Sequence, residues 1–134
     1  MNKILIGIKP DITSNLKSFK QSADVVKCIA SFFGENFLKA SDIYINSVEF
    51  ISKLYEGNEH QKSCVAHYGD KGWYCFVLET ELPFSQINNL KPKLRKKLKK
   101  YAIKSDHPAD NCIHISDSPE AAEREILLIK NYLV

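Results

Sequence analysis

The sequence predicts one α/β domain over residues 1–134, built on a four-stranded antiparallel sheet with helices packed against it. The length suits a single domain, since domains usually span about 100–200 residues. Hydrophobic residues make up 44% of the chain, which is enough for a real core. Segments with strand-like and helix-like apolar spacing alternate along it, and two long helices are expected on one face of the sheet. This βαββαβ order, with extra short helices, is typical of the ferredoxin-like α/β sandwich.

Three elements are expected in the first part of the chain. A short apolar run predicts a strand over Ile4–Ile8, which ends at Pro10 because proline cannot donate to a strand ladder. Apolar residues with a period near 3.6 predict a helix over Ser18–Phe33, capped by Gly34. Alternating apolar and polar residues predict a half-buried strand over Phe37–Ile45.

A short helix is expected next, because Asn46 with Glu49 three residues later resembles a capping box. Its apolar face should consist of Val48, Ile51, Leu54 and Tyr55.

The segment from Glu59 to Tyr68 is expected to be a second short helix or an irregular stretch. It places His60, Cys64 and His67 on one helical face, a spacing that could bind zinc. A structural zinc needs a fourth ligand, and no second Cys/His pair has a usual spacing. We therefore favour no metal at these residues.

A basic helix follows a buried strand. The nearly continuous apolar run Trp73–Leu78 predicts a strand buried on both faces. Apolar residues at helical spacing then predict a helix from Leu90 to Tyr101. Its other face is basic, with Lys91, Lys93, Arg95, Lys96, Lys97, Lys99 and Lys100, and Lys104 just beyond. Such a face could bind nucleic acid or polyphosphate. No aromatic residues alternate with the lysines, so base stacking is not indicated, and one or two cations that reach a phosphate are favoured.

The stretch from Asn111 to Glu125 combines a short apolar run with a well-capped helix. Ser118 suits the N-cap and Pro119 the first helical position. The helix has an apolar stripe of Ala122, Ile126, Ile129 and Leu133. Glu125 lies on the same stripe, and a carboxylate that faces a core needs a partner. The nearest candidate is His114, so we predict a buried or half-buried His–Glu pair at a strand-to-helix junction.

Composition excludes some classes of protein. No run of 18 or more apolar residues occurs, so no membrane span is expected, and the apolar run near the N-terminus is too short for a signal peptide. The four cysteines form no CxxC motif, which favours reduced thiols and a cytoplasmic location.

Two motifs at opposite ends of the chain resemble those of nucleoside diphosphate kinases. The family signature reads Asn-x-x-His-Gly-Ser-Asp-Ser and then, after a short gap, Ala-x-Arg/Lys-Glu-Ile. The residues that match it in register are Asn111, His114, Ser116, Asp117, Ser118, Ala122, Arg124, Glu125 and Ile126. The run Leu5–Asp11 resembles the family's first strand and its Ile-Lys-Pro-Asp motif. The resemblance implies the family's ferredoxin-like fold.

It also implies a phosphotransferase that moves the γ-phosphate of a nucleoside triphosphate to a nucleoside diphosphate through a phosphohistidine. By the resemblance, His114 is the nucleophile, Glu125 fixes its tautomer and orientation, and Ser116 supports the carboxylate or the phosphate. The residues implied to bind the nucleotide are Lys9, Tyr55, Arg95, Lys104 and Asn111. The family further implies Mg²⁺ held largely by the nucleotide, and a homo-oligomer.

The chain departs from the family pattern in two places. Ile115 stands where the signature has glycine, and Ala102, Ile103 and Lys104 take the place of a Thr-Ile-Arg segment. Two other readings therefore stay open. One is a member of the same fold that binds nucleotide or a partner protein without turnover. The other is a basic module that binds nucleic acid through Lys91–Lys104.

Overall fold

The computed structural model describes residues 1–38 and 41–133. Its elements, in chain order, are β1 (Asn2–Ile8), α1 (Pro10–Thr13), α2 (Phe19–Phe33), β2 (Asn36–Phe37), β3 (Ile43–Ile45), α3 (Val48–Leu54), α4 (Gln61–Tyr68), β4 (Trp73–Thr80), α5 (Phe84–Leu98), the 3₁₀ turn η1 (Lys99–Tyr101), β5 (Ile113–Ile115) and α6 (Pro119–Lys130).

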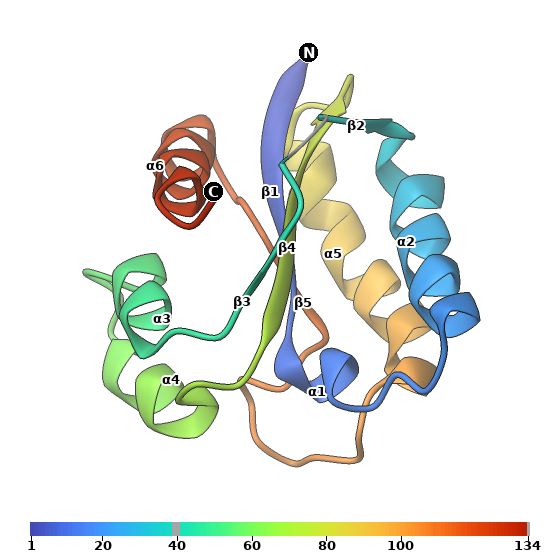
Figure 1. The fold of residues 1–134 in the computed structure, drawn as a ribbon. Helices are drawn as coiled ribbons and strands as arrows, with labels where there is room; N and C mark the ends of the chain where they lie inside the picture. The colour runs from blue at the N-terminus through green and yellow to red at the C-terminus, as the bar shows by residue number, and fades with distance from the viewer. Residues whose placement is uncertain (39–40, 134) are drawn as a thin grey trace.

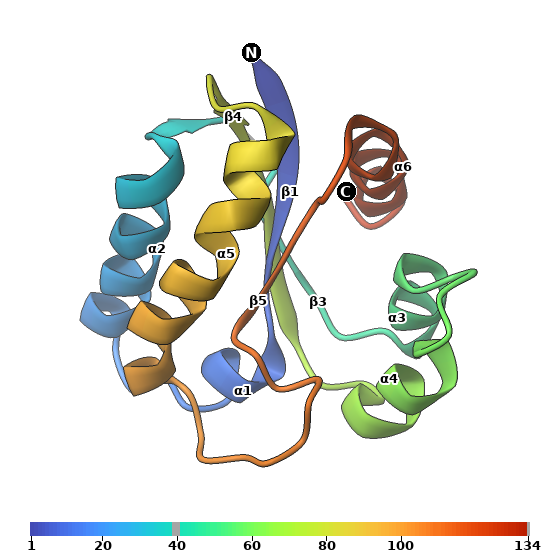
Figure 2. The same ribbon diagram turned by 180° about the vertical axis from the view of Figure 1, so that it is seen from behind.

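The predicted ferredoxin-like architecture is confirmed. The sheet has the order β2–β4–β1–β5 with antiparallel neighbours, and β3 pairs with β4 beyond the end of β2. Because β2 and β3 share one edge, they occupy a single position of a four-position sheet. Helices α2 and α5 cover one face, whereas α3, α4 and α6 cover the other (Figures 1 and 2). None of the helices in the described ranges is both long and apolar enough to cross a membrane.

The edge strand is broken, whereas we predicted a continuous strand over Phe37–Ile45. The Leu38 N–H donates to the Val77 carbonyl at 3.0 Å, but the Val77 N–H donates to the Ser41 hydroxyl at 3.1 Å. A side chain thus replaces the backbone in the ladder and divides the edge into β2 and β3. Residues 39–40 of that prediction lie outside the described residues.

Two helix boundaries also differ from the prediction. Ser47, not Asn46, caps α3, because its hydroxyl accepts from the Phe50 N–H at 3.3 Å. Phe50 is buried there and Val48 is exposed. Helix α5 begins at Phe84, before the predicted start at Leu90, and its buried Ile87 extends the predicted apolar stripe toward the N-terminus.

Strand β5 presents its side chains alternately to the two faces of the sheet. Ile113 and Ile115 belong to the core beneath α2 and α5, so His114 faces the side of α3, α4 and α6. Gly7 is the residue of β1 that pairs with His114. A Cβ at Gly7 would lie 3.1 Å from Trp73 Cε3, so glycine leaves room for the indole beside the histidine. Ile113 and Ile115 therefore fill the core beneath α2 and α5, and His114 does not take part in it.

Candidate functional site

The site centres on the predicted contact between His114 and Glu125, which the structure contains. His114 Nε2 lies 2.9 Å from Glu125 Oε1, and the Ser116 hydroxyl donates to the same oxygen at 2.8 Å. Ser116 is held in turn by β1, because its hydroxyl accepts from the Leu5 N–H at 2.9 Å and its own N–H donates to the Leu5 carbonyl. The Ser118 hydroxyl caps α6 as predicted, accepting from the Ala121 N–H at 3.1 Å. The strand, the turn and the helix thus fix the pair from both ends.

The environment of Glu125 selects one tautomer of His114. Burial acts to raise the pKa of the Glu125 carboxyl, but the hydrogen bonds from His114 and Ser116 and the charge of Arg124 outweigh it and hold that pKa below its usual range. An ionised carboxylate only accepts, so the His114 Nε2 atom must carry the proton. In the neutral imidazole, Nδ1 then keeps its lone pair. The side chain of His114 is 19% exposed against 4% for Glu125, so the partly exposed ring can meet a substrate while the carboxylate stays covered.

We expect the Ser116→Ala substitution to lower the free energy of unfolding by about 1–3 kcal/mol, because it leaves the Leu5 N–H buried without its acceptor. Loss of the Ser116 hydrogen bond also raises the pKa of Glu125 toward its ordinary value of 4.5, so the part of the stability difference that comes from Glu125 should shrink as the pH falls below 4.5. Urea unfolding at pH 7 and at about pH 3 measures both effects. An unchanged midpoint at both pH values would contradict this role.

Lys9 lies at the end of β1 in a second part of the site. Its ammonium donates to Asn111 Oδ1 at 2.7 Å and to the Ala109 carbonyl at 3.1 Å, and lies 5.7 Å from the centres of the Trp73 and Tyr68 rings. The residue is only 5% exposed. Burial, and next the charge of Arg95, lower the pKa of Lys9 to about 8. An incoming anion would relieve both effects.

Tyr55 and Arg95 lie on either side of these groups. The rings of Tyr55 and His114 meet edge to face with centroids 6.2 Å apart, and burial raises the pKa of the Tyr55 hydroxyl. Arg95 Nη2 donates to the Ile113 carbonyl at 3.2 Å, one residue before the histidine. The structure therefore brings together seven of the eight predicted site residues, all except Lys104: His114, Glu125, Ser116, Lys9, Tyr55, Arg95 and Asn111.

Sequence comparison finds no matching family model and no matching curated protein. Solved structures do match. Nucleoside diphosphate kinase from Aquifex aeolicus has a TM-score of 0.66 at 20% identity, over 96% of this chain and 94% of that chain. A nucleoside diphosphate kinase from Borrelia burgdorferi, solved with bound vanadate and ADP, has a TM-score of 0.66 at 19% identity, over 95% and 85%. A nucleoside diphosphate kinase family protein from Babesia bovis has a TM-score of 0.62 at 15% identity, over 96% and 87%. The chain has the nucleoside diphosphate kinase fold.

The two departures from the nucleoside diphosphate kinase signature lie in different surroundings, one in the core and one on an exposed loop. Ile115, in the place of glycine, points into the core on the face opposite His114 and is 3% exposed. Its side chain therefore does not crowd the site. Lys104 is exposed on the loop between η1 and β5, and no described hydrogen bond joins it to the groups around Lys9.

Asp11 contributes to this fold in a way that the sequence reasoning missed. It is 2% exposed, and its Oδ2 accepts from the Cys112 N–H at 3.0 Å. Cys112 has a positive φ of 79°, a conformation that is uncommon for a residue with a side chain. The contact holds this turn immediately before β5. The placement of Asp11 directly after Lys9 and Pro10 was the available signal.

The three candidate zinc ligands go to separate places. His60 is exposed beside Glu59, Cys64 is buried in the core, and His67 binds Asp110. Within residues 1–38 and 41–133, no group of three or more His, Cys, Asp or Glu side chains could hold a metal ion.

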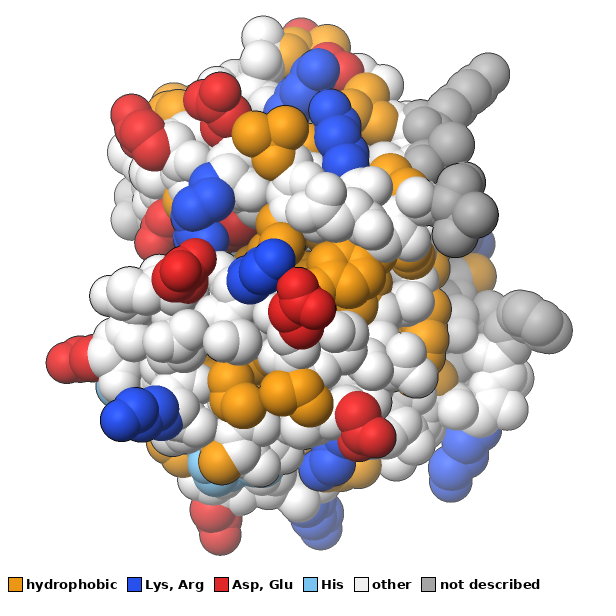
Figure 3. Space-filling view, turned by 60° about the vertical axis from the view of Figure 1, so that its left-hand side comes forward, with side chains coloured by type: hydrophobic (Ala, Val, Ile, Leu, Met, Phe, Trp, Pro, Cys, Tyr) orange, Lys and Arg blue, Asp and Glu red, His pale blue; other side chains and the backbone are white. Residues whose placement is uncertain are grey.

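The predicted basic face of α5 divides in two. Lys91 and Arg95 turn toward β5, where they donate to the carbonyls of Ile115 and Ile113, whereas the other lysines stay exposed. The face of the molecule formed by α3 and α6 mixes acidic, basic and apolar side chains (Figure 3). The exposed lysines of the predicted basic face lie on α5 and η1, on the other side of the sheet.

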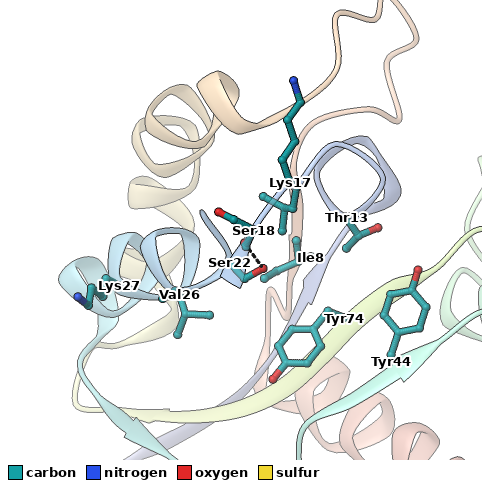
Figure 4. A pocket seen from close by; sticks show the side chains of 11 residues that line it. Ile8, Thr13, Lys17, Ser18, Ser22, Val26, Lys27, Tyr44 and Tyr74 are labelled. Atoms are coloured by element: carbon teal, nitrogen blue, oxygen red, sulfur yellow. Dashed lines mark hydrogen bonds between the residues drawn. The ribbon is translucent and has the colours of Figure 1, made fainter. Parts of the chain in front are cut away.

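Two hollows flank these elements. One, of about 350 Å³, lies beside Arg95 and Asn111 and is also lined by Lys96, Lys99 and Asp11. A larger one of about 940 Å³ lies between α2 and the strand pair that carries Tyr44 and Tyr74 (Figure 4). It contains none of the predicted site residues. Two of its polar side chains are already bonded within the chain, as Thr13 donates to the Gly72 carbonyl and Ser22 to the Ser18 carbonyl. The smaller hollow is therefore the one that adjoins the candidate chemistry.

Proposed function

We propose that the protein is a phosphotransferase of the nucleoside diphosphate kinase family, which moves the γ-phosphate of a nucleoside triphosphate to a nucleoside diphosphate through a phosphohistidine on His114. One observation carries the proposal: a partly exposed imidazole bonded through Nε2 to a buried, ionised Glu125. This arrangement prepares a nitrogen nucleophile at neutral pH, because the other ring nitrogen keeps its lone pair.

The reaction follows from that tautomer. The Nδ1 lone pair of His114 attacks the γ-phosphorus, an Nδ1–P bond forms, and the bond from the γ-phosphorus to the β–γ bridging oxygen breaks. The electron pair of the broken bond leaves with the nucleoside diphosphate. Positive charge that develops on the ring is stabilised by Glu125 through Nε2. The reverse steps with a second nucleoside diphosphate return the phosphoryl group and restore the neutral imidazole.

The cations of the site serve the phosphoryl group. Lys9 and Arg95 lie close enough for the charge of one to lower the pKa of the other, which is the electrostatic condition of an anion site. Asn111 orients Lys9 and offers its amide to the ribose or phosphate side of the nucleotide. Tyr55 packs on the edge of His114 and limits ring movement. Lys104 can contact the nucleotide only from the exposed loop.

Mg²⁺ fits this site as an ion held by the nucleotide rather than by the protein. The oxygens of Glu125 already bind His114 and Ser116 and face Arg124, and the other charged groups around Lys9 include the cation Arg95. When bound with the nucleotide, Mg²⁺ would neutralise part of the phosphate charge.

Incubation with ATP labelled on the γ-phosphate, in the presence of Mg²⁺, is expected to give a phosphoprotein that is stable to base and labile to acid. Addition of GDP or CDP should then move the label onto the nucleotide. A thermal shift with ATP but no label would favour the reading of a nucleotide-binding protein without turnover. Binding to nucleic acid that weakens steeply with salt, with neither label nor shift, would favour the basic module.

A further inference from the structure

The loop of residues 102–112 supplies both hydrogen-bond acceptors of the Lys9 ammonium, although it contains no helix or strand. The acceptors are the Ala109 carbonyl and the Asn111 side chain, which lie on either side of Asp110 in the sequence. A loop must be fixed by other contacts if it is to hold a buried cation in one place. Those contacts converge on Asp110.

Both carboxylate oxygens of Asp110 are engaged. Oδ1 lies 2.8 Å from His67 Nε2 on α4, and Oδ2 accepts from the Ser105 hydroxyl at 2.6 Å. The side chain of Asp110 is 5% exposed and that of His67 is 22% exposed, so water competes little for the bond between them, whereas the bond from Ser105 is exposed. Burial acts to raise the pKa of Asp110, but the hydrogen bonds from Ser105 and His67 outweigh it and lower that pKa. Asp110 is therefore a carboxylate at neutral pH.

His107 closes the network. Its N–H donates to the Ser105 hydroxyl at 3.1 Å, and its Nδ1 accepts from the Ala109 N–H at 3.1 Å. Its ring stacks on that of His67 with centroids 3.6 Å apart and planes 7° from parallel. The next residue of α4, Tyr68, donates its hydroxyl to the Ala109 carbonyl. Two successive residues of α4 thus contact the middle of the loop, whereas Asp11 holds its two ends by accepting from the N–H groups of Ile103 and Cys112.

Asp110 also acts on Lys9 through its charge. Burial and Arg95 lower the pKa of Lys9, whereas the surrounding groups Asp11, Cys64 and Asp110 raise it. Asp110 has the smallest effect of the three, but in the sequence it lies between the two acceptors of the ammonium.

We propose that Asp110 is a positioning residue for phosphoryl transfer, which fixes the loop on α4 through His67 and Ser105 so that Ala109 and Asn111 hold a protonated Lys9 toward the phosphoryl group. The role rests on the proposed function for its effect on rate. Its effect on Lys9 exists in the protein without nucleotide and can be measured separately.

The test compares Asp110→Asn with Asp106→Asn, which removes the same charge from an exposed position of the same loop. The ¹³Cε resonance of Lys9, assigned by its absence in Lys9→Met, is titrated in the full chain without nucleotide. We expect Asp110→Asn to lower the titration midpoint by about half a pH unit or more, and Asp106→Asn to leave it near the wild-type value. In the labelling assay, we expect the KM for ATP to rise about tenfold in Asp110→Asn but not in Asp106→Asn. The labelling rate of Asp110→Asn should also begin to fall at a lower alkaline pH than that of the wild type.

His67→Phe provides a second variant, because it keeps an aromatic ring against His107 and removes the hydrogen bond to Asp110. It should reproduce the rise in KM without a change of charge on the aspartate. If Asp110→Asn and Asp106→Asn give the same midpoint, the inference is wrong, whether or not the protein is a kinase. If the midpoints differ but wild type forms no phosphohistidine, the positioning of Lys9 stands and the proposed function fails.

Discussion

Replacement of His114 by Gln should reduce phosphoprotein formation from ATP and Mg²⁺ to background, a loss of at least about a thousandfold. The glutamine amide N–H can still donate to Glu125, so the hydrogen bond that supports the fold is kept. The lone pair of the free imidazole nitrogen has no equivalent in an amide. The variant should therefore lose the chemistry while its thermal midpoint stays close to that of the wild type.

His60→Gln is the matched control, because its side chain is 69% exposed and pairs only with the exposed Glu59. It should label at the wild-type rate. An acid-labile label of wild-type intensity in His114→Gln would mean that another side chain is the nucleophile. Mass spectrometry of the labelled peptide would then identify it.

Lys9→Met is expected to slow transfer strongly and to make the protein more stable at pH 7. Methionine fills the space of the lysine stem but removes the charge that faces Arg95 and the phosphoryl group. We expect labelling to fall by about a hundredfold or more, since a buried cation that contacts a phosphoryl group acts in a medium of low dielectric. Residual labelling should no longer show an alkaline limb near the Lys9 pKa of about 8.

The sign of the stability change follows from that pKa. A lysine pKa lowered from 10.5 to about 8 means that the folded state disfavours the charged form, by roughly 3 kcal/mol at 1.36 kcal/mol per pKa unit. This cost is fully present below pH 8 and disappears as the pH rises from about 8 to 10.5, because the folded protein then releases the proton first. Chemical unfolding should show Lys9→Met as the more stable protein at pH 7, with the difference shrinking by pH 10. A variant that is less stable than the wild type at pH 7 would contradict the conclusion that the folded state disfavours the charged form of Lys9.

The sequence predicted best what depends on neighbours along the chain. The strands β1 and β4 were identifiable because their apolar runs are long and central to the sheet. The pair of His114 and Glu125 spans 11 residues across one strand, one turn and one helix, so helical spacing alone pointed to it. The local sequence could not distinguish Asn46 from Ser47 as the N-cap of α3, because both residue types are good caps. The path of the backbone out of β3 determines which of the two caps the helix.

Contacts between distant segments needed more than periodicity. Lys9 and Asn111 lie 102 positions apart, and the resemblance of two motifs indicated that both belong to one site. The bond from His67 to Asp110 joins a short helix to an irregular loop, and neither carries a pattern that names the other. The broken edge strand has a similar cause, because the Ser41 hydroxyl takes the place of a backbone acceptor for Val77 on another strand, which periodicity does not indicate.

Trp73 gives the site a built-in optical reporter. It is the single tryptophan of the chain, is 0% exposed, and packs over Gly7, the residue of β1 that pairs with His114. Its indole lies 5.7 Å from the Lys9 ammonium and 6.4 Å from the Tyr55 ring. All intrinsic tryptophan fluorescence of this protein therefore arises from the floor of the site, so ligand titrations need no attached dye.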